Sequence, residues 1–258
     1  MTRRSAFLQV TWIMLAVFFA QNFPLAAQEK DYPEGPQGDR ELVADLRNLR
    51  PVDNAEWKGL LTLRGRDRTT TVMPVLGQSV SAGETQWKVI YLTSATKVMG
   101  AEKMTVIHTV DGSNQYLYAR APAPGAPLGE PKTLTGAEAD IPLAGSDFWL
   151  SDLGFEFYHW PQQHRLKGEL RRGRSCYVLE SINPQAKPGG YSRVKSWIDK
   201  ETSGPIEAEA YGADGKLLKA FELGKFQKVN GRYELRDMTI RNRRSGTQTK
   251  LEFDLGKN

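Results

Sequence analysis

Residues 205–255 read PIEAEAYGADGKLLKAFELGKFQKVNGRYELRDMTIRNRRSGTQTKLEFDL, and this stretch decides the fold. Apolar residues recur at every second position in short runs, which is the period of a β-strand with one buried face. Turn residues divide the runs at Asp214-Gly215, Gly224, Asn230-Gly231 and Ser245-Gly246. Turns this short connect antiparallel neighbours. The stretch therefore predicts an antiparallel meander with strands at 206–211, 216–223, 226–229, 232–242 and 247–255.

The same alternation continues upstream at 191–199, 104–110, 87–91 and 57–63, with Asp111-Gly112 as a hairpin signal. About ten strands are expected in all. Only two short helices accompany them, so a flat sheet of this size would leave one apolar face in water. We therefore predict a mainly β (α+β) fold: a single strongly curved antiparallel sheet that forms an incomplete β-barrel and is covered by short helices.

Helical spacing marks the first of these helices. Asp39 is expected to be its N-cap, and the helix is expected to bury Leu42, Val43, Leu46 and Leu49 and to stop at Pro51. The second is expected from Ser146 to near Gly154, followed by an extended piece that ends at Pro161. Between them, residues 121–145 hold five prolines and four glycines and predict a long surface loop or lid.

The N-terminus has the features of a secretion signal. Arg3 and Arg4 precede an apolar run at 7–20, and small residues end at Ala27. We predict a signal peptide at 1–27, a flexible tether at 28–38 and one folded domain at 39–258, which places the protein in the periplasm. The alternative is an anchor helix that is retained. Removing residues 1–27 lowers the net charge from +5 to +3, so the charge indicates no nucleic-acid partner.

The sequence lacks the usual patterns of a chemical centre. Its three histidines, His108, His159 and His164, form no metal-binding motif, and nucleotide-binding glycine patterns are absent. We expect no metal and no cofactor. Cys176, the only cysteine, is expected to be buried on a strand. Asp147 and Asp152 flank an aromatic stretch and leave one catalytic alternative, an acid pair as in glycosidases; a structural role for both is the other interpretation.

Aromatic residues are unusually dense, with six of them in the sixteen residues 146–161. Ordinary core packing is one explanation. The other is a pocket for an apolar guest, which needs little polar signature because apolar burial alone supplies the binding energy. The candidate lining residues are Trp57, Leu61, Leu63, Trp87, Val89, Tyr91, Phe148, Trp149, Leu153, Phe155, Phe157, Trp160 and Trp197.

Several short runs resemble those of the LolA-like outer-membrane lipoprotein-sorting proteins. Gly145-Ser146-Asp147-Phe148 followed by Asp152-Leu153 is similar to a signature of that family, and so are 191–199, 205–208 and 211–219. The resemblance implies a half-open barrel with a helical lid and no cofactor or chemistry. It also implies a monomeric periplasmic carrier that takes acylated lipoprotein from an inner-membrane donor to an outer-membrane acceptor. In such carriers a basic residue on an early strand helps to hold the lid, and Arg64 is the nearest candidate, with Asp147 and Asp152 as polar contacts.

Three functions follow from these observations. The first is a periplasmic carrier of lipoprotein acyl chains or of a related lipid. The second is a periplasmic sensor or adaptor that uses the same half-barrel to bind lipid, lipoprotein or a protein partner without transport. The third is a hydrolase of envelope glycans or lipids with Asp147 and Asp152 as its acids.

Overall fold

The computed structural model describes residues 30–49, 54–97, 99–110, 112–224, 226–229 and 232–254. The predicted signal peptide at 1–27 and residues 28 and 29 of the tether lie outside the described residues. So do Pro51, Asp111 and the Asn230-Gly231 turn.

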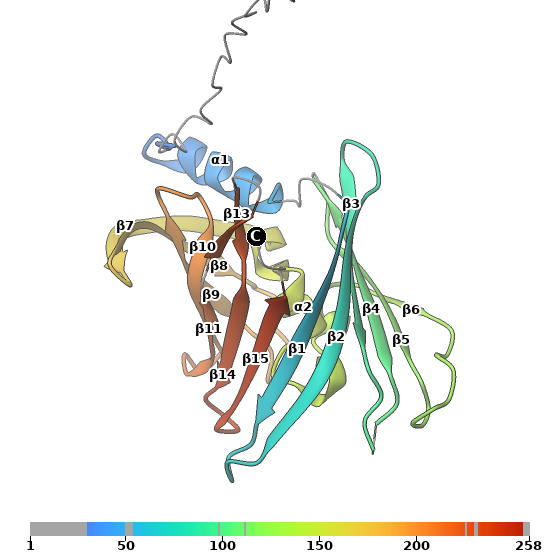
Figure 1. Ribbon diagram of the computed structural model, residues 1–258. Helices are drawn as coiled ribbons and strands as arrows, with labels where there is room; N and C mark the ends of the chain where they lie inside the picture. The colour runs from blue at the N-terminus through green and yellow to red at the C-terminus, as the bar shows by residue number, and fades with distance from the viewer. Residues whose placement is uncertain are drawn as a thin grey trace, which may run out of the picture.

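One antiparallel sheet forms the body of the molecule (Figure 1). Within the described ranges it has thirteen strands, in the spatial order β6-β5-β4-β3-β2-β1-β15-β14-β11-β10-β9-β8-β7. The sheet is strongly curved and is not closed into a barrel, since β6 and β7 are its two free edges. This arrangement confirms the predicted fold class. The strands are β1 (Ala55–Arg64), β2 (Thr70–Ser81), β3 (Gln86–Thr93), β4 (Glu102–Thr109), β5 (Gln115–Arg120), β6 (Lys132–Leu134), β7 (Gln162–Arg171), β8 (Arg174–Ile182), β9 (Arg193–Asp199), β10 (Pro205–Tyr211), β11 (Leu217–Leu223), β14 (Asp237–Asn242) and β15 (Thr247–Asp254).

Two meanders make up this sheet, and they meet where the first strand pairs with the last. Leu61 of β1 lies opposite Leu251 of β15, and each half then continues by antiparallel neighbours. The predicted strand 232–242 is wrong in one respect, because it divides into β13 (Arg232–Leu235) and β14. A separate two-stranded sheet of β12 (Phe226–Val229) and β13 leaves the main sheet, and β11 pairs directly with β14.

Helix α1 (Pro36–Arg47) lies across one end of the curved sheet (Figure 1). The predicted N-cap Asp39 is wrong: the N-cap is Gly35, with φ 89°, because Pro36 fits the first helical position. Asp39 lies inside the helix and accepts a hydrogen bond from the backbone N–H of Arg165 (3.2 Å). The predicted burial of Leu42, Val43 and Leu46 is confirmed. That of Leu49 is wrong: it is 46% exposed because the helix has already ended.

Residues 139–160, which we call the inner segment, lie within the curve of the sheet. Helix α2 (Leu150–Leu153) ends at Gly154 as predicted, but its N-cap is Trp149 and not Ser146. The piece expected to be extended is a 3-10 helix, η3 (Glu156–His159), which begins after Phe155 in the left-handed region. The Pro-rich stretch 121–145 contains the edge strand β6 and two 3-10 turns, η1 (Gly136–Ala139) and η2 (Leu143–Gly145). The predicted surface loop is wrong at its end, where Ala139, Leu143 and Ala144 are buried as part of the inner segment.

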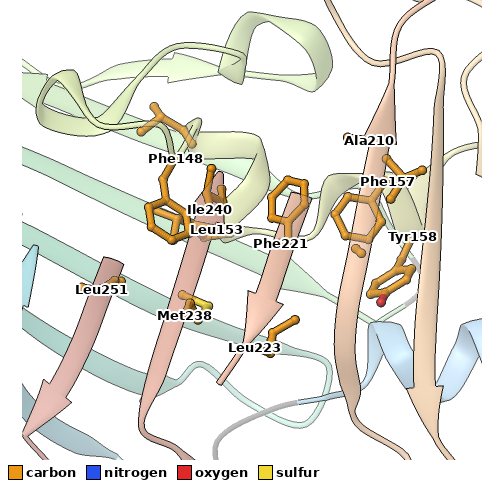
Figure 2. Packing of buried hydrophobic residues seen from close by; sticks show 14 of the residues in the cluster. Phe148, Leu153, Phe157, Tyr158, Ala210, Phe221, Leu223, Met238, Ile240 and Leu251 are labelled. Carbon is orange, nitrogen blue, oxygen red and sulfur yellow. The ribbon is translucent and has the colours of Figure 1, made fainter. Parts of the chain in front are cut away.

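The main core lies between the inner segment and the concave face of the sheet. Phe148, Leu153 and Phe157 from the inner segment meet Phe221 and Ile240 from the strands (Figure 2). In the part of the chain that the structure describes, no helix is both long and apolar enough to cross a membrane. Because the main core lies on the concave face, that face is the candidate position of a binding site.

Candidate functional site

The concave face of the sheet is apolar across most of its strands. Alternate residues of each strand point to it, because successive side chains of a strand point to opposite faces. The paired residues Leu61 and Met73, and then Tyr91 and Met104, carry this face from strand to strand. Its buried apolar residues are Leu61, Met73, Val75, Tyr91, Met104, Val106, Tyr116, Tyr177, Leu179, Val194, Ile198, Ala208, Ala210, Phe221, Leu223, Met238, Ile240 and Leu251.

The inner segment fills this concave face with its own apolar side chains. Leu150 and Tyr158 are 0% and 1% exposed, and the rings of Phe157 and Phe221 lie 6.4 Å apart (Figure 2). A cavity of about 20 Å³ remains beside Trp160 and Tyr191, which is room for a single water molecule. The half-barrel is therefore closed by a piece of its own chain in this structure.

A buried lysine fixes helix α2 to the sheet. Lys219 of β11 is 2% exposed, and its Nζ donates to the backbone oxygen of Asp147 (2.7 Å) and to Oδ2 of Asp152 (3.1 Å). The same ammonium lies 3.6 Å from the ring centroid of Trp149, a cation–π contact. Burial lowers the pKa of Lys219 and raises the pKa of Asp152, while the ion pair between them opposes both shifts. This pair is the ion pair that joins the inner segment to the sheet.

Asp152 has three partners in all. Besides Lys219, its Oδ2 accepts hydrogen bonds from the backbone N–H of Trp149 (2.8 Å) and from the hydroxyl of Tyr191 (3.3 Å). The first of these bonds caps helix α2. Asp152 therefore caps helix α2 and forms an ion pair with Lys219, which is the structural role that the sequence analysis gave as one interpretation.

Asp147 attaches the inner segment to the last strand. Its two carboxylate oxygens accept hydrogen bonds from the hydroxyls of Thr247 (2.5 Å) and Thr249 (2.9 Å) on β15. Its backbone N–H also donates to the Thr249 hydroxyl oxygen (2.9 Å). Because these bonds occupy both oxygens, the carboxylate is used for anchoring.

Two further polar attachments come from the other half of the sheet. Glu102 of β4, 2% exposed, accepts a hydrogen bond from the backbone N–H of Ala144 (2.7 Å), and the Asn114 amide donates to the backbone oxygen of Gly154 (2.8 Å). Both meet backbone groups of the inner segment that burial would otherwise leave without partners. The segment is therefore attached to both halves of the half-barrel.

Glu156 is a buried carboxyl group that faces the same region. The hydroxyl of Tyr116 donates to its Oε2 (2.8 Å), and burial raises the pKa of Glu156 to about 7, which the Tyr116 hydrogen bond partly offsets. Glu156 therefore titrates close to neutral pH.

The structure places the predicted site residues in three environments. Leu61, Tyr91, Phe148, Leu153 and Phe157 belong to the core between sheet and inner segment. A second group is partly buried around that core: Trp57, Leu63, Val89, Trp149, Phe155 and Trp160.

The remaining candidates lie elsewhere. Trp87 is buried and stacks on His108, with ring centroids 4.8 Å apart. Trp197 belongs to a separate cluster with Cys176, Val178 and Ile206. Since its neighbour Ile198 points into the core, Trp197 points to the convex side of the sheet, away from the other candidates. The predicted burial of Cys176 is confirmed.

Arg64 does not occupy the position expected of a lid contact. It is exposed at the end of β1, opposite Gln248 of β15. The basic residue that meets the inner segment is Lys219, which sequence reasoning missed. A signal was present, because Lys219 shares the alternation of Phe221 and Leu223 and so occupies a core position.

Comparison with known proteins agrees with this architecture. Similar solved structures include a DUF1329 family protein from Desulfovibrio piger, with TM-score 0.67, 15% identity, and coverage of 84% of this chain and 92% of that chain. A putative outer membrane lipoprotein-sorting protein domain from Vibrio parahaemolyticus gives TM-score 0.66 and 22% identity over 84% and 92% of the two chains. A LolA superfamily protein from Nitrosomonas europaea gives 0.57 and 17% over 83% and 90%. No curated protein matches the chain in sequence.

A family model described as "Uncharacterized protein" matches residues 84–255, from β3 to the end of the last strand. The chain therefore belongs to that family, and its fold is that of the LolA-like proteins.

Proposed function

We propose that this protein binds the acyl chain of a lipoprotein, or of a related lipid, in the half-barrel and carries it through the periplasm to the outer membrane. One observation carries the proposal: an apolar concave face is filled by a short segment of the same chain, which is attached to both halves of the sheet by separate polar contacts. Such a segment can be exchanged for an apolar guest of similar size. The fold supports the same function, because similar structures include a lipoprotein-sorting domain.

The energies support an exchange of this kind. Burying a methylene group gains about 0.8 kcal/mol, so a chain of a dozen methylenes gains roughly 10 kcal/mol before the costs of ordering. Breaking the buried ion pair between Lys219 and Asp152 costs about 3–5 kcal/mol if one partner is lost. The inner segment also buries apolar side chains of its own, among them Phe148, Leu153 and Phe157, at about 1.5–3 kcal/mol each, so the guest must cover the concave face in their place for the exchange to balance.

The hydrolase interpretation receives less support from the structure. Oδ2 of Asp152 is engaged by three donors, and both carboxylate oxygens of Asp147 accept hydroxyl groups of β15. Oδ1 of Asp152 has no hydrogen-bond partner, but it is buried, and the adjoining cavity of about 20 Å³ has no room for a sugar or a lipid headgroup.

Native mass spectrometry of the protein, isolated from a periplasmic extract without detergent, tests the proposal directly. Adducts with acyl-chain or lipopeptide masses are expected. A bare protein mass that stays bare with added lipopeptide would refute acyl binding and leave the sensor or adaptor function, with a protein partner, as the remaining hypothesis.

A locked variant tests the role of the inner segment. Asp147→Cys with Thr249→Cys replaces a side-chain hydrogen bond between the segment and β15 with a reducible disulfide, whose formation is checked by mass. The oxidised protein is expected to lose lipopeptide binding, and reduction is expected to restore it. The single variant Thr249→Cys controls for the loss of the hydrogen bond. Equal binding by the oxidised and reduced proteins would show that the segment is not displaced.

A further inference from the structure

The convex face of strands β1 to β5, which we call the outer face, is unusually apolar. Antiparallel sheets with one packed face normally present alternating polar residues to water on the other. Here Leu60, Val72 and Leu76 are 46%, 53% and 48% exposed, and Leu60 lies directly opposite Pro74. The apolar side chains of this face are Leu60, Val72, Pro74, Leu76, Val80, Ile90, Leu92, Ile107, Leu117 and Ala119.

Register brings these residues together on one face. Leu76 pairs with Leu92 across β2 and β3, and the apolar run is interrupted on β4, where Thr105 lies between Ile90 and Leu117. The inner segment covers the opposite face of these strands, and on this face the Pro-rich loop covers part of β4 and β5, where Thr105 and Ala119 are buried. An exposed apolar surface of several strands is typical of an interaction site.

The charged side chains on the outer face are basic, with one exception. Lys58, Arg64, Lys88 and Lys103 point to it, and Glu56 is its one carboxylate among the described residues of β1 to β5. The basic groups lie among the apolar positions: Lys88 lies opposite Ile107, and Lys103 opposite Leu92. Apolar side chains mixed with cations complement a surface that has apolar chains beneath anionic groups.

A hollow at one end of this face has the same character. Leu128, Gly129 and Pro131 of the Pro-rich loop lie over β4 and β5 and border an open pocket of about 230 Å³. Leu117 and Ala119 form its floor, and Lys103 is the charged residue among its walls. An apolar hollow with a cation at its wall suits a hydrocarbon chain that ends in an anionic group.

We propose that the outer face docks on a lipid bilayer that carries anionic headgroups. The exposed aliphatic side chains enter the boundary between headgroups and acyl chains, and the lysines and the arginine meet the phosphates. This surface is distinct from the concave interior, so a protein docked in this way keeps its inner segment free to open. The inference does not depend on what the interior binds.

Cosedimentation with vesicles tests the proposal. The protein is expected to bind vesicles of phosphatidylcholine mixed with phosphatidylglycerol, more weakly with added salt, and to bind phosphatidylcholine alone poorly. The double variant Val72→Glu with Leu76→Glu is expected to bind the anionic vesicles at least about tenfold more weakly, because it removes apolar contact and adds repulsion. Lys88→Glu is expected to lower the salt dependence and the affinity.

Leu170→Glu is the matched control, because Leu170 on β7 is 78% exposed and lies outside the outer face. It is expected to bind the anionic vesicles like the unchanged protein. Absence of vesicle binding, or an equal loss in Leu170→Glu, would overturn the proposal. A concentration-dependent dimer that the Val72 and Leu76 changes abolish would also overturn it, in favour of a second copy as the occupant. Thermal unfolding and lipopeptide binding are measured on the same variants and are expected to stay unchanged. These two measurements distinguish a failure of membrane docking from a failure of acyl-chain binding.

Discussion

The buried ion pair between Lys219 and Asp152 provides the sharpest test of how the inner segment is held. In Lys219→Met the ammonium is replaced by a flexible apolar side chain that still fills the space beside Trp149. The carboxylate of Asp152 then keeps the Trp149 N–H and the Tyr191 hydroxyl but loses its cation, and the backbone oxygen of Asp147 loses its donor.

Leaving one member of a buried ion pair without its partner costs about 3–5 kcal/mol. Both side chains here are nearly inaccessible to water, at 3% and 1% exposed, so solvent does not replace the lost contact. The cation–π contact with Trp149, at 3.6 Å, is part of the same loss and is not added separately. We expect the closed inner segment to be destabilised by about 3–5 kcal/mol.

Hydrogen exchange measures this loss locally. The amide of Leu150, which donates to the backbone oxygen of Ile141, reports on the inner segment, and an amide of β14 such as that of Ile240 reports on the sheet. Exchange at Leu150 is expected to accelerate by roughly a hundredfold to several thousandfold, since each 1.4 kcal/mol is a factor of ten. Lipopeptide affinity is expected to rise, because less free energy is needed to open the segment.

Two control variants distinguish the loss of the Lys219–Asp152 ion pair from a general loss of stability. Lys195→Met removes a more exposed ion pair, with Glu169, and is expected to cost less than about 1 kcal/mol. Lys219→Met combined with Asp152→Asn is expected to recover most of the loss, because no buried charge is left alone. Unchanged exchange at Leu150 in Lys219→Met, or no recovery in the double variant, would refute the reasoning.

Three other predictions concern single residues. Burial raises the pKa of Glu156 from 4.5 to about 7, so its contribution to stability is present below pH 4.5 and is lost as the pH rises through 7. Relative to the unchanged protein, Glu156→Gln is therefore expected to gain on the order of 3 kcal/mol in unfolding free energy between pH 4.5 and 8. Urea unfolding of both proteins measures this difference, and a difference that does not change with pH would contradict the prediction. Gly77→Ala is expected to lower the unfolding free energy by about 1–3 kcal/mol in the same assay, because an added Cβ would lie 1.8 Å from the Trp57 ring. Gly204→Ala is the control and should lower it less, because the nearest atom to its added Cβ is 3.6 Å away. Cys176, which is 0% exposed and whose thiol pKa is raised by burial, is expected to resist a thiol reagent in the folded protein and to react in urea, and rapid labelling of the native state would show that β8 opens.

The sequence predicted many of the residues that belong to the candidate site, but it did not predict the face of the sheet to which each side chain points. Phe148, Leu153 and Phe157 were expected at the interior because aromatic and aliphatic residues crowd one short stretch, and they do lie in the core. Trp197 met the same compositional criterion but points to the convex side. A period of two separates a strand's residues into two faces, yet it does not say which face the curvature will turn inward.

The expected extended piece after Gly154 shows a second limit. Its sequence, Phe155 to Trp160, has neither a helical nor a strand period, and the structure makes it the 3-10 helix η3. The backbone oxygen of Tyr158 accepts a hydrogen bond from Arg47 of α1, and the oxygens of Phe157 and Trp160 accept bonds from Gln163. Contacts across the fold therefore fix a conformation that local preference leaves open.

The sequence by itself determined the antiparallel class of the sheet, most strands of its C-terminal half and the end of α2 at Gly154, because these depend on neighbours a few residues apart. It did not predict β2, β5, β6 and β7, or the division of 232–242 into two strands. Only the tertiary structure decided how strongly the sheet curves, which face receives the inner segment, and that Lys219 rather than Arg64 holds it. The reason is physical. A lysine and an aspartate separated by 67 residues can be buried as a pair only when the sheet brings them within 3.1 Å, and no local pattern encodes that meeting.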